Sequence, residues 1–372
     1  MKVVFLDLTR FDYSPATPNE QPLGGGHSAV CYLAVELAKA GHDIALVNNI
    51  RRPGIYEKIA CPGRAVGITA NYLNQFDAVV VCSSAHGHEL RSLGVSSRLI
   101  LWTQHATNQR AMAALQGNDE RAAWDAFVMV SAWQTKDYVK TFDLPSEKIK
   151  VLKNAVAPRF ESLMRARAPF FLSDSPPLLV YTSTPFRGLD VLLKSFPSIR
   201  AAIPGCRLKV YSSMKVYQVS PDKDEHQGLY DLCRTIDGAE YIGSVPQPRL
   251  ASALSEADIL AYPSTFEEMA CISVMEAMAA GCVVVTSKLG ALSETLAGYG
   301  FLMEPRVDVV EFANEYARAV VELVKGARQR PDMFLKIIEE ERKFVRANYV
   351  WASRACEWEQ WLRGIIAEAH GS

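Results

Sequence analysis

The chain has 372 residues, of which 49% are hydrophobic and 22% are charged. This length favours two domains over a single core, and the composition is typical of a globular protein. The net charge of −1 provides no basic field that would indicate a nucleic-acid partner.

The N-terminus and the cysteines both indicate a cytoplasmic protein. No apolar run approaches the ~20 residues that span a bilayer, and the apolar start at residues 1–8 carries Asp7 and is too short for a signal peptide. The eight cysteines are scattered without a C-x-x-C pair. We therefore expect free thiols in a reducing compartment and no zinc site.

The first half of the chain alternates short apolar runs with helical patterns. Gly24-Gly25-Gly26-His27 leads into a predicted helix over 29–40, which ends at Gly41. Strands are predicted at 3–8, 44–47, 78–82, 99–103 and 126–130. Strands that alternate with helices favour a mostly parallel, doubly wound sheet.

The pattern breaks after Pro158. Residues 159–177 carry three prolines, three arginines and the apolar run Phe170-Phe171-Leu172. We interpret 158–177 as a solvated interdomain linker, although its basic and aromatic residues also suit peripheral contact with a membrane.

A second alternation of strands and helices follows the linker. Strands are predicted at 178–182, 208–211, 239–242 and 259–262, with a helix over 191–199. Helical patterns close the chain at 309–325, 333–348 and 352–369. The two halves therefore read as two doubly wound domains with a cleft between them.

The most informative stretch contains Glu268 and Glu276, eight residues apart. A strand ends at Tyr262, a helix begins near Ile272, and a β-branched strand follows Gly281, which makes one βαβ unit. The N-terminus of such a helix lies where open α/β sheets bind ligands, and its free N–H groups favour phosphate. The two acids would take hydroxyls of a sugar nucleotide, unless Glu268 merely precedes a helix and Glu276 is an exposed helix residue.

The chain resembles glycosyltransferase family 4, the retaining enzymes of GT-B fold, over nearly its whole length. The resemblance rests on the glycine loop at 24–27, on Arg187-Gly188 and on the Glu268-x7-Glu276 pair, which Gly290 and Glu294 continue. It also rests on segments 130–133, 147–154, 241–245 and 257–264 in the family's order. It implies two Rossmann-like domains facing across a cleft, with boundaries at 1–157 and 178–350 and with helix 352–369 packing back on the first domain.

The resemblance also implies roles for individual residues. Glu268 would bind hydroxyls of the donor sugar, Glu276 the ribose diol, and Arg187 the departing diphosphate. His105 falls where family members often have a histidine facing the sugar, although a structural histidine is equally expected there; His86 and His88 are weaker alternatives. The implied donor-binding residues are Gly25, Gly26, Ser183, Thr184, Met269, Ala270, Cys271, Ile272, Ser273 and Glu276.

Two departures from the family pattern concern the donor. Met269-Ala270-Cys271 stands where the family usually has Gly-Phe-Gly, so that side chains occupy positions where glycine allows close approach. The family's arginine before its Lys-Gly segment is absent, and Arg187 stands in place of the lysine. Ser183 and Thr184 could supply hydrogen bonds to the diphosphate instead.

The expected function is a metal-independent, retaining transfer of a sugar from a nucleoside diphosphate to an acceptor hydroxyl. The acceptor would be a glycan, a lipid-linked molecule or a small molecule, bound mainly by the N-terminal domain. Asp222-Lys-Asp224 has the spacing of a metal motif but reads as solvated surface. The alternatives are a sugar-nucleotide isomerase or epimerase of GT-B architecture and a non-catalytic sugar-nucleotide-binding subunit.

Overall fold

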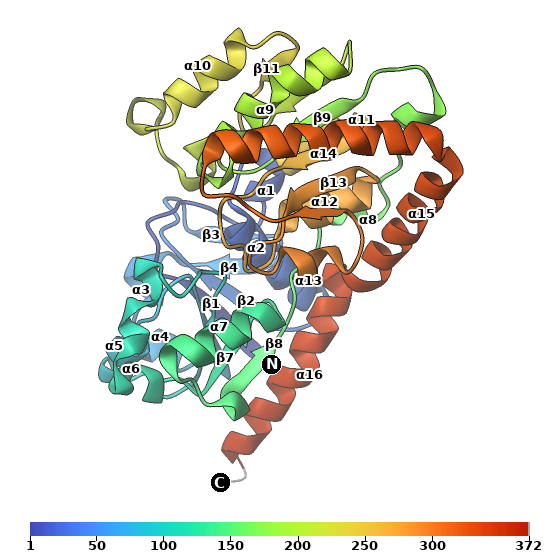
Figure 1. Ribbon diagram of the computed structural model, residues 1–372. Helices are drawn as coiled ribbons and strands as arrows, with labels where there is room; N and C mark the ends of the chain where they lie inside the picture. The colour runs from blue at the N-terminus through green and yellow to red at the C-terminus, as the bar shows by residue number, and fades with distance from the viewer. Residues whose placement is uncertain (371–372) are drawn as a thin grey trace. The chain divides into compact units, whose positions relative to one another are not determined.

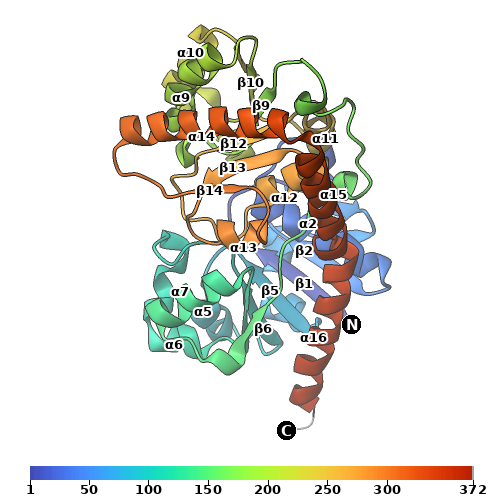
Figure 2. The same ribbon diagram turned by 45° about the vertical axis from the view of Figure 1, so that its right-hand side comes forward.

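The computed structural model describes residues 1–370, and the chain divides into two compact units. Unit 1 contains Met1–Pro18, Gly24–Ala155 and the segment from Val350 onward. Unit 2 contains Asn19–Leu23 and Val156–Tyr349. Each unit is an α/β structure built on its own sheet, as predicted (Figures 1 and 2).

Unit 1 is built on an eight-stranded sheet in the order β3-β4-β2-β1-β5-β6-β7-β8 within the described residues. All neighbouring strands are parallel except the hairpin of β3 and β4. The strands are β1 (Lys2–Asp7), β2 (Asp43–Val47), β3 (Gly54–Tyr56), β4 (Ile59–Cys61), β5 (Ala78–Cys82), β6 (Arg98–Trp102), β7 (Ala126–Met129) and β8 (Ile149–Val151). The central strands are buried throughout, because helices cover both faces of a parallel sheet.

The helices of unit 1 include one from the far end of the chain. They are α2 (Gly25–Lys39), α3 (Arg64–Gly67), α4 (Ala70–Leu73), α5 (Gly87–Ser92), α6 (Asn118–Ala122), α7 (Ala132–Phe142), α16 (Trp351–His370) and the 3-10 turns η1 (Arg110–Gln116) and η2 (Ser146–Lys148). α16 packs beside α2, and its Trp358 meets Trp102 at the end of β6 with ring centroids 5.1 Å apart. The short helix α1 (Thr17–Glu20) begins in the residues of unit 1 and ends in those of unit 2.

Unit 2 is built on a six-stranded, fully parallel sheet in the order β11-β10-β9-β12-β13-β14 within the described residues. Its strands are β9 (Leu178–Tyr181), β10 (Arg207–Val210), β11 (Ala239–Tyr241), β12 (Ile259–Tyr262), β13 (Val283–Ser287) and β14 (Phe301–Met303). Chain order reverses between β9 and β12, which makes a topological switch point of the kind where open sheets bind ligands.

The helices of unit 2 flank this sheet. They are α8 (Pro158–Glu161), α9 (Leu189–Ala202), α10 (Gln227–Thr235), α11 (Gln247–Glu256), α12 (Ile272–Ala280), α13 (Leu292–Leu296), α14 (Val309–Gln329), α15 (Pro331–Asn348) and the 3-10 turns η3 (Phe170–Leu172), η4 (Pro185–Arg187), η5 (Met214–Tyr217) and η6 (Pro221–Lys223). α14 lies along α9 in both views (Figures 1 and 2), whereas α15 packs on α12.

The segment expected to be a solvated linker packs into unit 2. Phe170 and Phe171 are 1% and 6% exposed, so their rings are not available to a membrane. Asp258, at the start of β12, anchors the segment: its carboxylate accepts from Arg165 at 3.1 Å, from Arg167, and from the Phe170 N–H at 3.2 Å. Ion pairs with Asp258 therefore hold segment 158–177 against unit 2, although its composition predicts a solvated linker.

No helix within residues 1–370 is long and apolar enough to cross a membrane.

Replacing Asp258 with alanine should destabilise unit 2 strongly. Asp258 is 2% exposed, and its loss leaves two arginines without their buried partner, which costs about 3–5 kcal/mol in comparable sites. The measurement is urea unfolding of D258A followed by circular dichroism. The matched control is D237A, which removes the partner of Arg200 at a side chain that is 88% exposed and should cost less than about 1 kcal/mol. Equal effects of the two substitutions would contradict the anchoring role.

Candidate functional site

The predicted βαβ unit is present in unit 2 as β12, α12 and β13. β12 ends at Tyr262, α12 begins at Ile272, and Gly281 ends the helix in the left-handed conformation with φ 75°. The first intrahelical bonds are donated by Val274 and Met275 to the Cys271 carbonyl. The N–H groups of Ile272 and Ser273 therefore precede the helical ladder and point toward the switch-point edge of the sheet, where an anion is favoured.

Glu268 lies directly before this helix end and is held from two sides. Its Oε1 accepts a hydrogen bond from Arg187 Nη1 at 2.7 Å and another from the Tyr262 hydroxyl. The residue is 4% exposed. Gly290 makes room for it, since a Cβ at Gly290 would lie 2.5 Å from the Glu268 carbonyl oxygen. Both recorded donors go to Oε1, which leaves Oε2 able to accept from a ligand.

Arg187 reaches Glu268 from the turn that joins β9 to α9. Gly188 follows with φ 101°, and a Cβ there would lie 2.0 Å from the Pro263 carbonyl oxygen. Only glycine therefore allows this turn to approach the end of β12. The family-like Arg-Gly pair is thus a packing requirement as well as a source of charge.

The surroundings of Arg187 keep it charged and fixed. Its guanidinium lies 4.6 Å from the ring centroid of Phe266 and 5.5 Å from that of Phe186, within range of cation–π attraction. Burial lowers the pKa of Arg187, but the negative charge of Glu268 outweighs burial and raises that pKa well above its ordinary value. A permanent cation therefore stands beside the free N-terminus of α12.

Glu276 lies on α12 and is buried, so the alternative of an exposed helix residue is wrong. It is 2% exposed, and burial raises its pKa to about 8, although the Ala157 N–H and the Gln247 side chain oppose the shift. Within the described part of the chain its Oε1 has no hydrogen-bond partner. A buried carboxyl with an unused oxygen is costly unless a ligand completes it.

Other buried polar atoms near these residues also lack partners. Within residues 1–370 they include Thr182 Oγ1, Thr184 Oγ1, Arg187 Nε and Gln247 Oε1. Ser273 links this group to α12, because its hydroxyl donates to the Thr182 carbonyl at 2.9 Å. Ser183 donates to the Tyr262 hydroxyl at 3.5 Å. Ser183 and Thr184 therefore lie beside the N-terminus of α12, as predicted. Buried donors without partners gather there, as is expected where an anionic oxygen of a ligand binds.

The residues that replace the expected glycines are packed into the protein. Met269 and Cys271 are 3% and 4% exposed, and Ala270 is half-buried. Two of the three side chains are thus covered by protein.

Unit 1 holds the remaining predicted residues at the carboxyl ends of its strands. Gly25 and Gly26 open α2, after Gly24 in extended conformation, and the first bond of that helix is donated by Ser28 to the Gly24 carbonyl at 3.0 Å. A Cβ on Gly26 would meet Gln104 at 3.7 Å, an ordinary contact, so protein packing does not require glycine there.

His105 is also in unit 1, after β6. Its Nδ1 lies 2.8 Å from Gln109 Oε1. Burial lowers the pKa of His105, and the charge of nearby His27 lowers it further, against the opposing effect of Gln109. The imidazole is therefore neutral at neutral pH and is held by its own loop.

The structure brings the predicted residues together in two groups. Unit 2 gathers Glu268, Arg187, Ser183, Thr184, Glu276 and the 269–273 loop, whereas unit 1 gathers Gly25, Gly26 and His105. Sequence reasoning missed Tyr262, Phe266 and Gln247, which hold Glu268, Arg187 and Glu276. Nothing in the local pattern distinguishes them, because each acts on a residue that only the folded chain brings close.

The charged loop at 222–224 differs from its interpretation as solvated surface. Asp222 is exposed, but Asp224 is 8% exposed and accepts from the Tyr230 hydroxyl at 2.8 Å and from the His226 N–H at 3.0 Å. Asp224 therefore has a structural role in ordering this loop.

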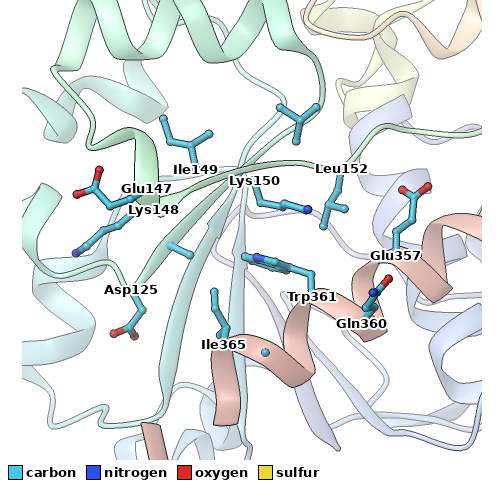
Figure 3. Close-up of a pocket in the computed structure, with 13 residues that line it drawn as sticks. Asp125, Glu147, Lys148, Ile149, Lys150, Leu152, Glu357, Gln360, Trp361 and Ile365 are labelled. Carbon is cyan, nitrogen blue, oxygen red and sulfur yellow. The ribbon is translucent and has the colours of Figure 1, made fainter. Parts of the chain in front are cut away.

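A hollow of about 910 Å³ in unit 1 contains none of these residues. It lies between the sheet-edge strand β8 and α16, where Lys150 and Trp361 are among the lining side chains (Figure 3). Lys150 stands on this edge strand, and lysines on an edge strand discourage pairing with another strand.

Comparisons with known proteins agree with this geometry. The family model described as Glycosyl transferases group 1 matches residues 176–325, which lie within unit 2. An uncharacterised glycosyltransferase of Methanocaldococcus jannaschii is 25% identical over 181 residues, which are 45% of this chain and 44% of that protein. The lipopolysaccharide 1,2-N-acetylglucosaminetransferase of Salmonella typhimurium is 25% identical over 200 residues, 52% of this chain and 49% of that protein. The matches thus span about half the length of these relatives.

Solved structures match nearly the whole chain. A glycosyltransferase from Rickettsia africae superposes with TM-score 0.73 at 14% identity, over 98% of this chain and 99% of that one. Anabaena HepE in complex with UDP-glucose superposes with TM-score 0.70 at 14% identity, over 100% of this chain and 99% of that one. The predicted GT-B fold, with two Rossmann-like domains, is confirmed.

Replacing Glu276 with glutamine should change how stability depends on pH. The pKa of this carboxyl is raised from 4.5 to about 8 in the folded chain. The unfolded chain therefore releases the proton first, and folding stability falls as pH rises from about 4.5 to 8, by on the order of a few kcal/mol. E276Q cannot ionise, so the loss of melting temperature between pH 5 and pH 8 should be smaller than in the parent. An unchanged loss would show that burial of Glu276 does not set this dependence.

Proposed function

We propose that this chain, which carries a Glycosyl transferases group 1 domain at residues 176–325, transfers a sugar from a nucleoside diphosphate donor to an acceptor hydroxyl with retention of configuration. The observation that carries the proposal is the N-terminus of α12, bracketed by Glu268 with Arg187 on one side and by Glu276 on the other. The surrounding buried polar atoms without partners support a polar ligand at this point.

Each part of the donor has a matching group in unit 2. The diphosphate would lie at the N–H groups of Ile272 and Ser273, with the hydroxyls of Ser183 and Thr184 as further donors. The sugar hydroxyls would donate to Oε2 of Glu268, because Oε1 is already occupied by Arg187 and Tyr262. The ribose diol would donate to Oε1 of Glu276. A protonated or ionised Glu276 can accept there in either state.

Arg187 would stabilise the departing nucleoside diphosphate. Its Nη1 is used by Glu268, but its buried Nε has no partner within residues 1–370. Because developing charge on the leaving group dominates the barrier in such a transfer, a fixed cation aimed at it is worth several kcal/mol, about 3–4 for one donor in comparable sites. The cation and the helix end together would supply charge stabilisation without a bound metal, so we propose a metal-independent reaction.

The acceptor side of the proposal rests on unit 1. The relative from Salmonella acts on lipopolysaccharide, and HepE binds UDP-glucose. For this chain we propose a glycan, lipid-linked or small-molecule acceptor that presents a hydroxyl to the carboxyl edge of the unit 1 sheet, where Gly25, Gly26 and His105 lie.

Nucleotide binding should depend on Glu276. Calorimetric titration with UDP, GDP and ADP should give micromolar-range binding of at least one of them. E276A should weaken that binding about 2- to 10-fold, since at neutral pH it removes a hydrogen bond to a mostly protonated carboxyl, worth ~0.5–1.5 kcal/mol. The matched control is E339Q, which alters an exposed glutamate of α15 and should bind as the parent does. If none of the three nucleotides binds, the proposal is wrong.

The reaction type is read from the products. Proton NMR of the product with UDP-glucose, UDP-N-acetylglucosamine, GDP-mannose or ADP-glucose should show the donor's anomeric configuration. An inverted product would contradict retention, an epimer formed without acceptor would indicate an isomerase, and binding without turnover would indicate a non-catalytic subunit.

A further inference from the structure

The hollow between β8 and α16 contains an aromatic surface that the core of unit 1 holds in place. Trp361 of α16 is half-buried and lines the hollow. Its ring centroid lies 5.7 Å from that of Trp358, which is 0% exposed and packs in turn on Trp102 of β6. The orientation of the Trp361 ring is therefore set by buried neighbours, while part of the ring stays open to the hollow (Figure 3).

One side of α16 is left uncovered beside this ring. Trp361, Gly364 and Ile365 are three and four residues apart, so they lie on the same side of the helix, and all three line the hollow. Gly364 has no side chain to cover the ring, and a Cβ there would meet no atom outside its own stretch of helix within 4 Å. Figure 3 shows Trp361 and Ile365 projecting from α16 toward β8. The helix therefore gives the hollow an apolar floor.

The opposite wall is the open edge of the unit 1 sheet. β8 pairs with β7 and has no strand on its other side within the described residues. Because Leu152 donates its N–H to the Met129 carbonyl at 2.9 Å, the backbone groups of Lys150 and Leu152 point toward β7. Alternation along the strand turns the N–H and the carbonyl of Val151 toward the open edge. This wall therefore presents a backbone donor and a backbone acceptor.

Exposed polar side chains add further hydrogen-bonding groups. Glu147, Lys150 and Gln360 are exposed and line the hollow. The carboxylate of Glu147 accepts hydrogen bonds, the ammonium of Lys150 donates them, and the amide of Gln360 does both. A ligand with many hydroxyl groups could use all three side chains.

The charges around the hollow favour a neutral ligand. Five charged side chains line it: Asp125, Glu147, Lys148, Lys150 and Glu357. Neither sign dominates among three carboxylates and two lysines. Asp125 is already paired with two arginines, and Lys148 donates to a backbone carbonyl at 2.8 Å. A polyanion or a polycation would therefore find no continuous field of the opposite sign.

A glycan combines the properties that this lining requires. A sugar ring carries C–H groups on its faces, which pack on an aromatic ring, and hydroxyls around its rim, which donate and accept. A peptide strand would also use the open edge, but Lys150 on the edge strand disfavours it. The volume of about 910 Å³ lies near the top of the ~300–1,000 Å³ range of pockets for drug-sized ligands, so it suits several linked sugar rings.

We propose that the hollow between β8 and α16 binds a neutral oligosaccharide, which stacks on Trp361 and bonds to Lys150 and to the Val151 backbone. The choice of a glycan among neutral polar ligands rests on the proposed function, because an enzyme that transfers sugars meets such chains. Leu152 places one end of the hollow at the carboxyl end of β8, the sheet edge to which we assign the acceptor. The site would retain a glycan acceptor through sugar units that do not react.

The test is calorimetric titration of the full chain with four neutral probes: maltohexaose, cellohexaose, chitohexaose and mannohexaose. At least one of them should bind. W361A should weaken that binding about tenfold or more, because the stacking surface is lost. K150A should weaken it about 2- to 10-fold, the effect of one hydrogen bond.

Two further variants keep the test independent of folding. G364L adds a side chain at an exposed helix position with free space around it, so it should keep the parent's melting temperature and still obstruct the hollow. Its affinity for the oligosaccharide should fall at least as far as that of K150A. The matched control for W361A is Y72A, which removes a half-buried aromatic ring of α4 that lies 5.3 Å from Phe76 and outside the hollow. Y72A should bind as the parent does.

The outcomes separate this inference from the proposed function. Titrations with UDP, GDP and ADP report on unit 2 and should be the same for G364L and the parent. If a nucleotide binds but no oligosaccharide does, the glycan site is wrong and the proposed function stands. An oligosaccharide that binds K150A and G364L as tightly as the parent lies elsewhere, which also overturns the inference. If the variants weaken oligosaccharide binding but no nucleotide binds, the glycan site stands and the proposed function fails.

Discussion

The hydrogen bonds that Glu268 receives from Arg187 and Tyr262 hold the candidate site of unit 2 together. They connect three segments that are far apart in the chain: the turn after β9, the end of β12 and the loop before α12. Gly188 and Gly290 permit the approach, because a Cβ on either would collide with backbone of the neighbouring segment. One carboxylate thereby fixes both the position of the cation and the entry into the helix.

Burial gives the same site its chemical character. Glu268 and Glu276 are 4% and 2% exposed, so water cannot satisfy their oxygens in place of a ligand. The two buried carboxyls are accommodated in different ways. Glu268 is paired with the cation of Arg187, whereas Glu276 has no cationic partner among the described residues, and burial raises its pKa to about 8. A polar site with unused oxygens and donors is less stable than an apolar one, and a bound polar molecule recovers that stability.

Much of the fold follows from local pattern. The apolar runs at β5, β7, β12 and β13 are buried on both faces, so they read as strands without alternation. The sequence analysis did not predict the hairpin of β3 and β4 or the strands β8 and β14, each only three residues long, because so short a run rarely shows a detectable period; the equally short β11 is an exception. The segment 158–177 looked solvated because its arginines and aromatics have partners, Asp258 and Phe334, that lie far along the sequence.

The sequence by itself determined the two doubly wound sheets, the βαβ unit with its two glutamates, and the residues that gather at the switch point of unit 2. These features follow from hydrophobic periodicity, from glycines at turns that require them and from the spacing of motif residues, all of which are local properties of the sequence. Only the tertiary structure decided that Glu276 is buried, that Tyr262 and Arg187 share one oxygen of Glu268, and that β8 and α16 line one hollow. Burial and pairing depend on which segments the sheet brings side by side, and no local pattern encodes that.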